Sequence, residues 1–148
     1  MMDWPLTEEE ETALCNAARN ARGHAYAPYS KFRVGAALLC EDGRIFEGCN
    51  VENASYGLCL CAERVAVGAA VAAGTQQLKG IAIITGSSPP SPPCGMCRQV
   101  VSEFRADLPI ILLNDKDEKE RLDLASVFPS TFDHRLLLDG VDRDGGQP

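Results

Sequence analysis

The stretch Cys61-Ala62-Glu63-Arg64 is completed more than thirty residues later by Pro93-Cys94-Gly95-Met96-Cys97. The three thiols indicate a catalytic zinc site, because a structural zinc ion is usually enclosed by four protein ligands and a catalytic one keeps a position open. Glu63 lies two residues after the first thiol, close enough to act on a bound water without binding the metal. Both stretches open helical segments, so the sequence predicts a fold in which two helix N-termini converge on one cation and favour thiolates.

Further stretches accompany these two elements. They are Ala27-Pro28-Tyr29-Ser30-Lys31-Phe32, Gly48-Cys49-Asn50-Val51-Glu52-Asn53-Ala54-Ser55-Tyr56-Gly57-Leu58 and Cys94-Gly95-Met96-Cys97-Arg98-Gln99-Val100. A ligand-x-Glu element followed by P-C-x-x-C is typical of zinc deaminases. From roughly Tyr26 to Phe132, the chain resembles the small, homotetrameric cytidine deaminases of pyrimidine salvage.

This resemblance implies a cytoplasmic hydrolase with one Zn²⁺ per subunit, assembled as a homotetramer. Its reaction would be the hydrolytic deamination of cytidine and deoxycytidine to uridine and deoxyuridine, with release of ammonia. The implied zinc ligands are Cys61, Cys94 and Cys97, and Glu63 would move the protons. Arg64 lies on the same helical face as Cys61, where it would donate hydrogen bonds to the thiolates and offset the negative charge of a three-thiolate site.

The resemblance also implies how the substrate is held. Within one subunit, Phe32 would pack on the base, Asn50 and Glu52 would hold the ribose hydroxyls, and the backbone of Ala62 would read the base edge. Residues reaching in from neighbouring subunits would be Ala54, Tyr56 and Phe132, with Phe128 as an alternative to Phe132. Cys59 departs from the family pattern, which often has Thr at this position.

Length and charge narrow the class of protein. At 148 residues, the chain has the size of one domain, expected to span residues 1–148 with flexible tails at about 1–6 and 139–148. The net charge of −7 argues against binding to nucleic acid, because proteins that neutralise phosphates carry clustered Lys and Arg. No apolar run approaches the roughly 20 residues of a membrane-spanning helix.

Cysteine usage favours a reducing, cytoplasmic location. The chain has seven cysteines, an odd number, and no apolar signal segment precedes them. Three thiols on zinc leave Cys15, Cys40, Cys49 and Cys59, which we expect to be mostly small buried hydrophobes. His24 and His134 have no partner at ligand spacing, so neither is expected to bind metal.

The chain in order predicts a three-layer α/β/α domain whose mixed sheet of about five strands opens with an antiparallel pair. A capping box at Thr7 and Glu10 starts a helix that Gly23 ends, and Asp42-Gly43 forms a hairpin turn. The expected strands are 32–40, 45–51, 81–85 and 109–114, and the expected later helices are 61–74 and 94–104. We expect the charged residues 115–121 to form a solvated turn, and the apolar helix 61–74 to contact other subunits as well as the core.

Three alternatives remain open from the sequence. A structural zinc protein would use a fourth thiol such as Cys59 or Cys49, but would leave Glu63 without a role. A polynucleotide editor fits poorly with the acidic charge. A deaminase of nucleoside antibiotics such as blasticidin S is disfavoured by the intact Asn-Val-Glu-Asn stretch at residues 50–53.

Overall fold

A mixed five-stranded sheet forms the centre of the protein, whose computed structural model describes residues 3–140. The strands are β1 (Gly35–Cys40), β2 (Ile45–Cys49), β3 (Leu78–Thr85), β4 (Pro109–Asn114) and β5 (Lys119–Asp123), in the spatial order β2-β1-β3-β4-β5. Among these five strands of the described residues, only β3 and β4 pair in parallel. The predicted mixed sheet with an opening antiparallel pair is confirmed.

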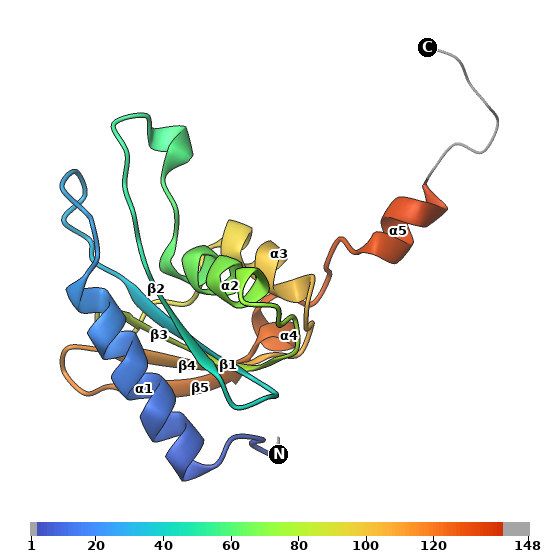
Figure 1. The fold of residues 1–148 in the computed structure, drawn as a ribbon, viewed down its shortest axis with the longest axis horizontal. Helices are drawn as coiled ribbons and strands as arrows, with labels where there is room; N and C mark the ends of the chain where they lie inside the picture. Colours follow the sequence, from blue (N-terminus) through green and yellow to red (C-terminus); the bar gives the residue numbers. More distant parts are fainter. Residues whose placement is uncertain (1–2, 141–148) are drawn as a thin grey trace.

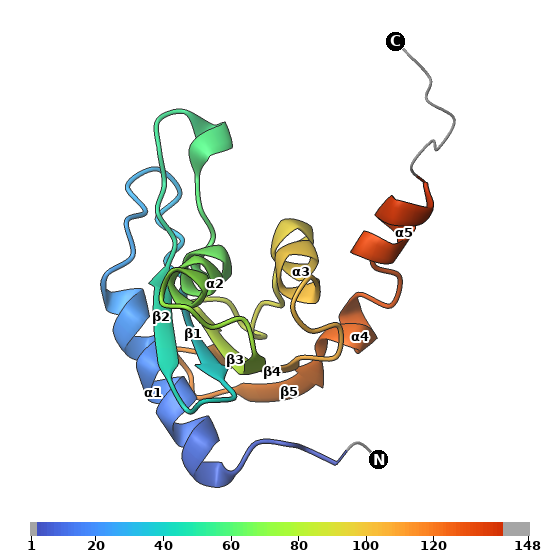
Figure 2. The ribbon, with the colours of Figure 1, turned by 45° about the vertical axis from the view of Figure 1, so that its right-hand side comes forward.

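Helices cover both faces of this sheet (Figures 1 and 2). The helix α1 (Glu8–Gly23) lies on one face, and α2 (Ala62–Ala72) and α3 (Gly95–Ser102) lie on the other. Along β1, Ala36 and Leu38 join the core beneath α2 and α3, and Ala37 and Leu39 join the core beneath α1. Both faces of the strand are therefore apolar, as a three-layer α/β/α arrangement requires. The shorter helices are η1 (Tyr56–Leu58), α4 (Leu124–Val127) and α5 (His134–Asp139).

The start of α1 follows the prediction, but the segment before it does not. Thr7 Oγ1 accepts a hydrogen bond from the Glu10 amide at 3.1 Å, and the Glu10 carboxylate accepts one from the Thr7 amide at 3.0 Å. Leu6 is buried and Trp4 packs against the same core, so the expected flexible start at residues 1–6 is wrong for these two residues. The physical reason is apolar burial, since their side chains extend the core under α1.

The hairpin between β1 and β2 also forms as predicted, with Gly43 at φ +86° in the turn. The strand before it is shorter than expected and starts at Gly35 instead of Phe32. The side chain of Asn50 is the reason: its Oδ1 accepts from the Val34 amide at 2.9 Å, and its Nδ2 donates to the Phe32 carbonyl at 2.7 Å. These bonds take the place of those that a neighbouring strand would make.

The fifth strand lies where a solvated turn was expected. Residues 119–123 form β5 at the edge of the sheet, where charged side chains are common because one strand edge faces water. Two of these charges contact α1, since Lys119 Nζ and Arg121 Nε lie 3.0 and 2.7 Å from carboxylate oxygens of the buried Glu11. The expectation of a turn therefore holds only for the residues before Lys119.

Two glycines allow the helices to approach the sheet closely. A Cβ atom added at Gly48 in β2 would lie 2.2 Å from the carbonyl oxygen of Ala62, and one added at Gly35 would lie 2.1 Å from that of Ala18. Gly48 therefore lets the first turn of α2, which follows Cys61, rest directly on the sheet.

The C-terminal part of the described chain projects away from the body, and α5 lies apart from the sheet in both views (Figures 1 and 2). Leu136, Leu137 and Leu138 are each more than half exposed. Most of the tail predicted at 139–148 lies outside the described residues, as do residues 1–2. Within residues 3–140, no helix combines the length and apolar character that crossing a membrane requires.

Candidate active site

Three thiols meet where α2 and α3 begin. Cys61 and Cys94 are the residues that cap these two helices, and Cys97 lies in the first turn of α3. Their sulfur atoms all lie within 4.8 Å of one another, with 3.7 Å between those of Cys61 and Cys94. Two sulfurs at about 2.3 Å from a tetrahedral zinc ion lie about 3.8 Å apart, so this spacing fits zinc. It is far too long for a disulfide bond, whose sulfurs lie about 2 Å apart.

The surroundings of the thiols favour negative charge. Hydrogen bonds from Cys97, Cys94 and Arg64 lower the pKa of Cys61 to about 5 although burial opposes this. Cys97 donates to the Cys61 thiolate and is itself buried, and both effects raise the pKa of Cys97. A bound Zn²⁺ ion would resolve this competition, because its charge would deprotonate the thiols that hold it.

Arg64 lies beside the cluster, as the sequence predicted. Its Nη2 atom is 4.0 Å from Cys61 Sγ and donates to the carbonyl oxygen of Cys59 at 2.9 Å. Its Nε–H group is buried and has no partner within the described residues. The guanidinium thus brings one positive charge to a site whose three thiolates would outweigh the charge of Zn²⁺.

Glu63 is positioned beside the thiols without belonging to their cluster. Its side chain comes from the first turn of α2 and is only 5% exposed. Burial raises the pKa of Glu63 above its ordinary value, because a charged carboxylate is poorly solvated there. A carboxyl group with a raised pKa next to a metal site can both accept and return a proton.

A cavity of about 310 Å³ opens over these groups, a volume at the lower end of the range for small-molecule sites. The predicted site residues that line it are Phe32, Asn50, Glu52, Cys61, Ala62, Glu63 and Cys94. The structure therefore brings together residues from four separate stretches of the sequence around one space.

The side chains of Asn50 and Glu52 hold the backbone that borders the cavity. The amide of Asn50 bridges Phe32 and Val34 as described above, and the Glu52 carboxylate accepts from the amides of Tyr29 and Ser30 at 3.0 and 3.1 Å. The Ser30 hydroxyl also donates to Glu52, and these bonds, led by that hydroxyl, lower the pKa of Glu52. Glu52 is thus an anion that fixes the loop carrying Phe32.

The residues expected from neighbouring subunits do not line this cavity. Ala54, Tyr56 and Phe132 are exposed, with 75% of Tyr56 and 57% of Phe132 accessible. Tyr56 instead packs edge-on against Tyr29, with ring centroids 6.0 Å apart. Phe128, the alternative to Phe132, packs against the core beneath α2 and α3.

Several cavity residues escaped the sequence analysis. The cavity also contains the apolar side chains of Val34, Leu60, Ile83 and Pro92, and the hydroxyl residues Ser30, Thr85 and Ser91. Thr85 is the last residue of β3, and Ser91 precedes Cys94 by three positions. The sequence offers one signal for Thr85 and Ser91, which is their position at the end of a strand and in a loop next to a metal ligand. Such positions usually border ligand sites in open α/β sheets.

The sequence model described as "Cytidine and deoxycytidylate deaminase zinc-binding region" matches residues 8–112. The chain belongs to this family. A cytidine deaminase of Sporosarcina psychrophila is 46% identical over 120 residues, covering 80% of this chain and 88% of the relative. That of Halalkalibacterium halodurans is 43% identical over 120 residues, covering 80% and 91%.

Solved structures of the family agree with the fold. The crystal structure of cytidine deaminase from Burkholderia pseudomallei superposes with a TM-score of 0.80 at 45% identity, covering 86% of this chain and all of that one. The structure from Mycobacterium tuberculosis gives a TM-score of 0.72 at 40% identity, covering 83% and 97%. Since the family region is zinc-binding and the thiol cluster fits zinc, the cofactor of this protein is Zn²⁺.

Proposed function

We propose that this protein hydrolyses the 4-amino group of cytidine and deoxycytidine, giving uridine or deoxyuridine and ammonia. The observation that carries the proposal is the buried Glu63 beside three convergent thiols at the wall of a nucleoside-sized cavity. The chain's similarity to cytidine deaminases over most of its length supports the same activity.

Cys61, Cys94 and Cys97 would hold the zinc, which when bound makes water nucleophilic near neutral pH. Glu63 accepts the proton that this water loses and delivers it to N3 of the pyrimidine as the new C4–O bond forms. It then takes the second proton of the water and gives it to the 4-amino nitrogen, and the C4–N4 bond breaks. Water and cytidine are consumed, and uridine and ammonia leave.

We assign the other cavity residues to substrate binding. Phe32 is 45% exposed and faces the cavity, where its ring can pack on the base. Ala62 is fully buried, so its contribution is its backbone, at the base edge. Asn50 and Glu52 would hold the ribose hydroxyls with the hydrogen-bonding capacity that their backbone partners leave, and charge-assisted bonds to Glu52 are the stronger kind.

The sugar assignment can be tested with a closed cycle of two substrates and two proteins. Glu52→Gln should weaken the use of cytidine by roughly 1.5–3 kcal/mol in kcat/KM, the range for a hydrogen bond to a charged group. Free cytosine, which has no ribose, should remain an equally poor substrate for both proteins. Because Glu52 also fixes the loop at Tyr29 and Ser30, an equal loss on both substrates would assign it to that structural task alone.

We also propose that the chain acts as one domain within a homotetramer in the cytoplasm. All five strands belong to one sheet, which supports a single domain. None of the seven cysteines forms a disulfide bond, which suits a reducing compartment. The surface supports assembly, because Tyr56, Leu58, Met96 and Phe132 are all more than half exposed and apolar. In a tetramer Ala54, Tyr56 and Phe132 would complete the cavities of neighbouring subunits.

A parallel assay tests the proposed activity against its alternatives. The zinc-loaded protein should release ammonia from cytidine and deoxycytidine, and far more slowly, if at all, from cytosine, blasticidin S and single-stranded DNA. Preference for blasticidin S would assign the protein to antibiotic deaminases. Zinc binding without turnover of any of these compounds would favour a structural metal site.

A further inference from the structure

Three hydroxyl groups form a row whose two end residues, Thr85 and Ser91, both line the cavity. Thr85, at the end of β3, is 2% exposed, and its Oγ1 lies 2.9 Å from Ser87 Oγ. Ser87 Oγ in turn lies 2.5 Å from Ser91 Oγ. Ser91 lines the cavity, as does the thiol residue Cys94 three positions further along the chain.

The hydrogen bonds of Ser87 fix the direction of this row. A hydroxyl group has one hydrogen to donate and two lone pairs to accept with. Ser87 Oγ lies 3.0 Å from the carbonyl oxygen of Pro89, which can only accept. All three contacts of Ser87 Oγ can be hydrogen bonds in only one arrangement, in which Ser87 donates to Pro89 and accepts from both Thr85 and Ser91. The hydrogen of Ser91 therefore points at Ser87, and the Ser91 oxygen offers only lone pairs to the cavity.

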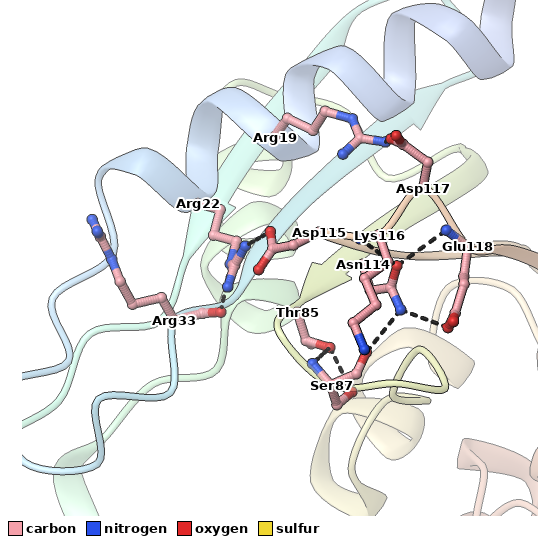
Figure 3. A network of polar contacts seen from close by, with 10 residues as sticks. All are labelled: Arg19, Arg22, Arg33, Thr85, Ser87, Asn114, Asp115, Lys116, Asp117 and Glu118. Carbon is pink, nitrogen blue, oxygen red and sulfur yellow. Dashed lines mark hydrogen bonds and ion pairs between the residues drawn. The ribbon is translucent and has the colours of Figure 1, made fainter.

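The turn between β4 and β5 anchors this row (Figure 3). Asn114, which is 1% exposed, donates to the carbonyl oxygen of Ser87 at 3.0 Å and to the Glu118 carboxylate at 2.7 Å. The amide side chain of Asn114 is itself held, because its Oδ1 accepts from the amides of Lys116 and Glu118. The backbone of Ser87 is therefore held in place by the turn.

We propose that Ser91 is a specificity-determining residue, an oriented hydrogen-bond acceptor that binds the N–H donors of the 4-amino group and disfavours a carbonyl oxygen in the same place. The proposal rests on the proposed function, because it concerns the same cavity. Cytidine carries two N–H donors on its 4-amino group, and uridine carries an acceptor oxygen there. An acceptor that cannot rotate attracts the first and opposes the second, which separates substrate from product.

The test compares Ser91→Ala with Ser88→Ala, a matched loss of one hydroxyl from the same loop. Ser88 is exposed, bonds to Glu118 and is absent from the cavity lining. For each zinc-loaded protein we would measure kcat and KM with cytidine and the inhibition constant of uridine. Ser91→Ala should lower kcat/KM for cytidine about 3- to 10-fold, the loss of one neutral hydrogen bond. Its inhibition by uridine should stay the same or tighten, and Ser88→Ala should leave both quantities near those of the wild type.

Ser87→Ala gives a readout that a merely structural role would not produce. Without the Ser87 oxygen, the Ser91 hydrogen loses its acceptor and can turn toward the cavity. Uridine should then inhibit more tightly than it inhibits the wild type, because Ser91 can donate to the carbonyl oxygen at C4, while cytidine gains nothing.

Three results would overturn the proposal. They are equal changes of the cytidine and uridine constants in Ser91→Ala, no change of either constant in that variant, and uridine inhibition in Ser87→Ala that is unchanged or weaker. If instead the wild-type protein fails to deaminate cytidine at all, the proposed function itself falls and the assignment of Ser91 falls with it.

Discussion

Glu63 combines burial with proximity to a metal site, and its replacement separates binding from turnover. Glu63→Gln keeps the shape of the side chain and leaves the three thiols intact, so zinc should stay bound at one ion per chain. Turnover should fall by at least about 10²-fold, because the amide cannot shuttle protons. Metal analysis and initial rates on cytidine measure both effects. Glu103→Gln, an exposed change on the segment after α3, is the control and should alter neither.

The thiols permit a sharper test of the metal site. Cys94→Ala should lose zinc and activity together, because the cluster then has only two sulfur ligands. Cys59→Ala should keep its zinc, since Cys59 lies outside the cluster and its sulfur instead accepts from the Asn53 amide at 3.3 Å. The zinc content per chain of each variant distinguishes a three-thiol site from a four-thiol site. Loss of zinc from the Cys59 variant would indicate a closed four-thiol structural site.

At the scale of single residues, the sequence predicted the thiols and Glu63 better than it predicted the other residues that line the cavity. The thiols and Glu63 could be found because their spacing is specific to one kind of site. Thr85 and Ser91 could not, because an isolated hydroxyl residue has many uses and only the folded chain brings these two toward Ser87. The hydrogen bonds by which Asn50 and Glu52 hold loop backbone were also absent from the sequence pattern.

Among the elements, the contact between α1 and β5 should make stability depend on pH. Burial raises the pKa of Glu11, but hydrogen bonds and charge from Arg121 and Lys119 outweigh it and leave the pKa below the ordinary value of 4.5. A lowered pKa in the folded state stabilises the protein above the ordinary pKa, and this contribution is lost as the pH falls through the lowered one.

Glu11→Gln should therefore lower the free energy of unfolding at pH 7 by roughly 1.5–3 kcal/mol, the range for hydrogen bonds to charged groups. It should also flatten the loss of stability between pH 5 and pH 3. Urea unfolding of both proteins at pH 7, pH 5 and pH 3 measures these two effects. Glu9→Gln, an exposed change in the same helical turn, is the control, and an equal response of the two variants would contradict the role of the ion pairs.

Local signals explain which elements were predictable. The capping box at Thr7 and the Asp-Gly turn at Gly43 are short-range devices, and both occur in the structure as expected. The edge strand β5 was missed because its charged residues follow no apolar pattern, and its partners on α1 lie more than a hundred positions away. The start of β1 was misplaced because a side chain, Asn50, satisfies the backbone that a strand would have paired.

For the whole molecule, subunit mixing tests whether neighbouring chains complete each cavity. Glu63→Gln and Tyr56→Ala should each be poorly active alone, and mixed assemblies should exceed the sum of both. In a mixed tetramer, a Tyr56→Ala chain keeps its own Glu63 and receives Tyr56 from its neighbour. Light scattering checks that each variant assembles.

A second mixture serves as the control. Glu52 and Glu63 line the cavity of one and the same chain, so mixing Glu52→Gln with Glu63→Gln creates no site that has both groups intact. Rescue in this control, or no rescue with Tyr56→Ala, would contradict the arrangement of sites between subunits.

The placement of the thiols on two helices also gives a way to judge a purified sample. Cys61 and Cys94 are separated in the chain by β3, which occupies the middle of the sheet, so the three sulfurs meet only after that strand is in place. The zinc content of a preparation therefore counts its correctly folded molecules before any substrate is added. A thiol-reactive dye should find at most four cysteines in such molecules, and more in those that have lost the metal, where the partly exposed Cys61 and the exposed Cys94 become reactive.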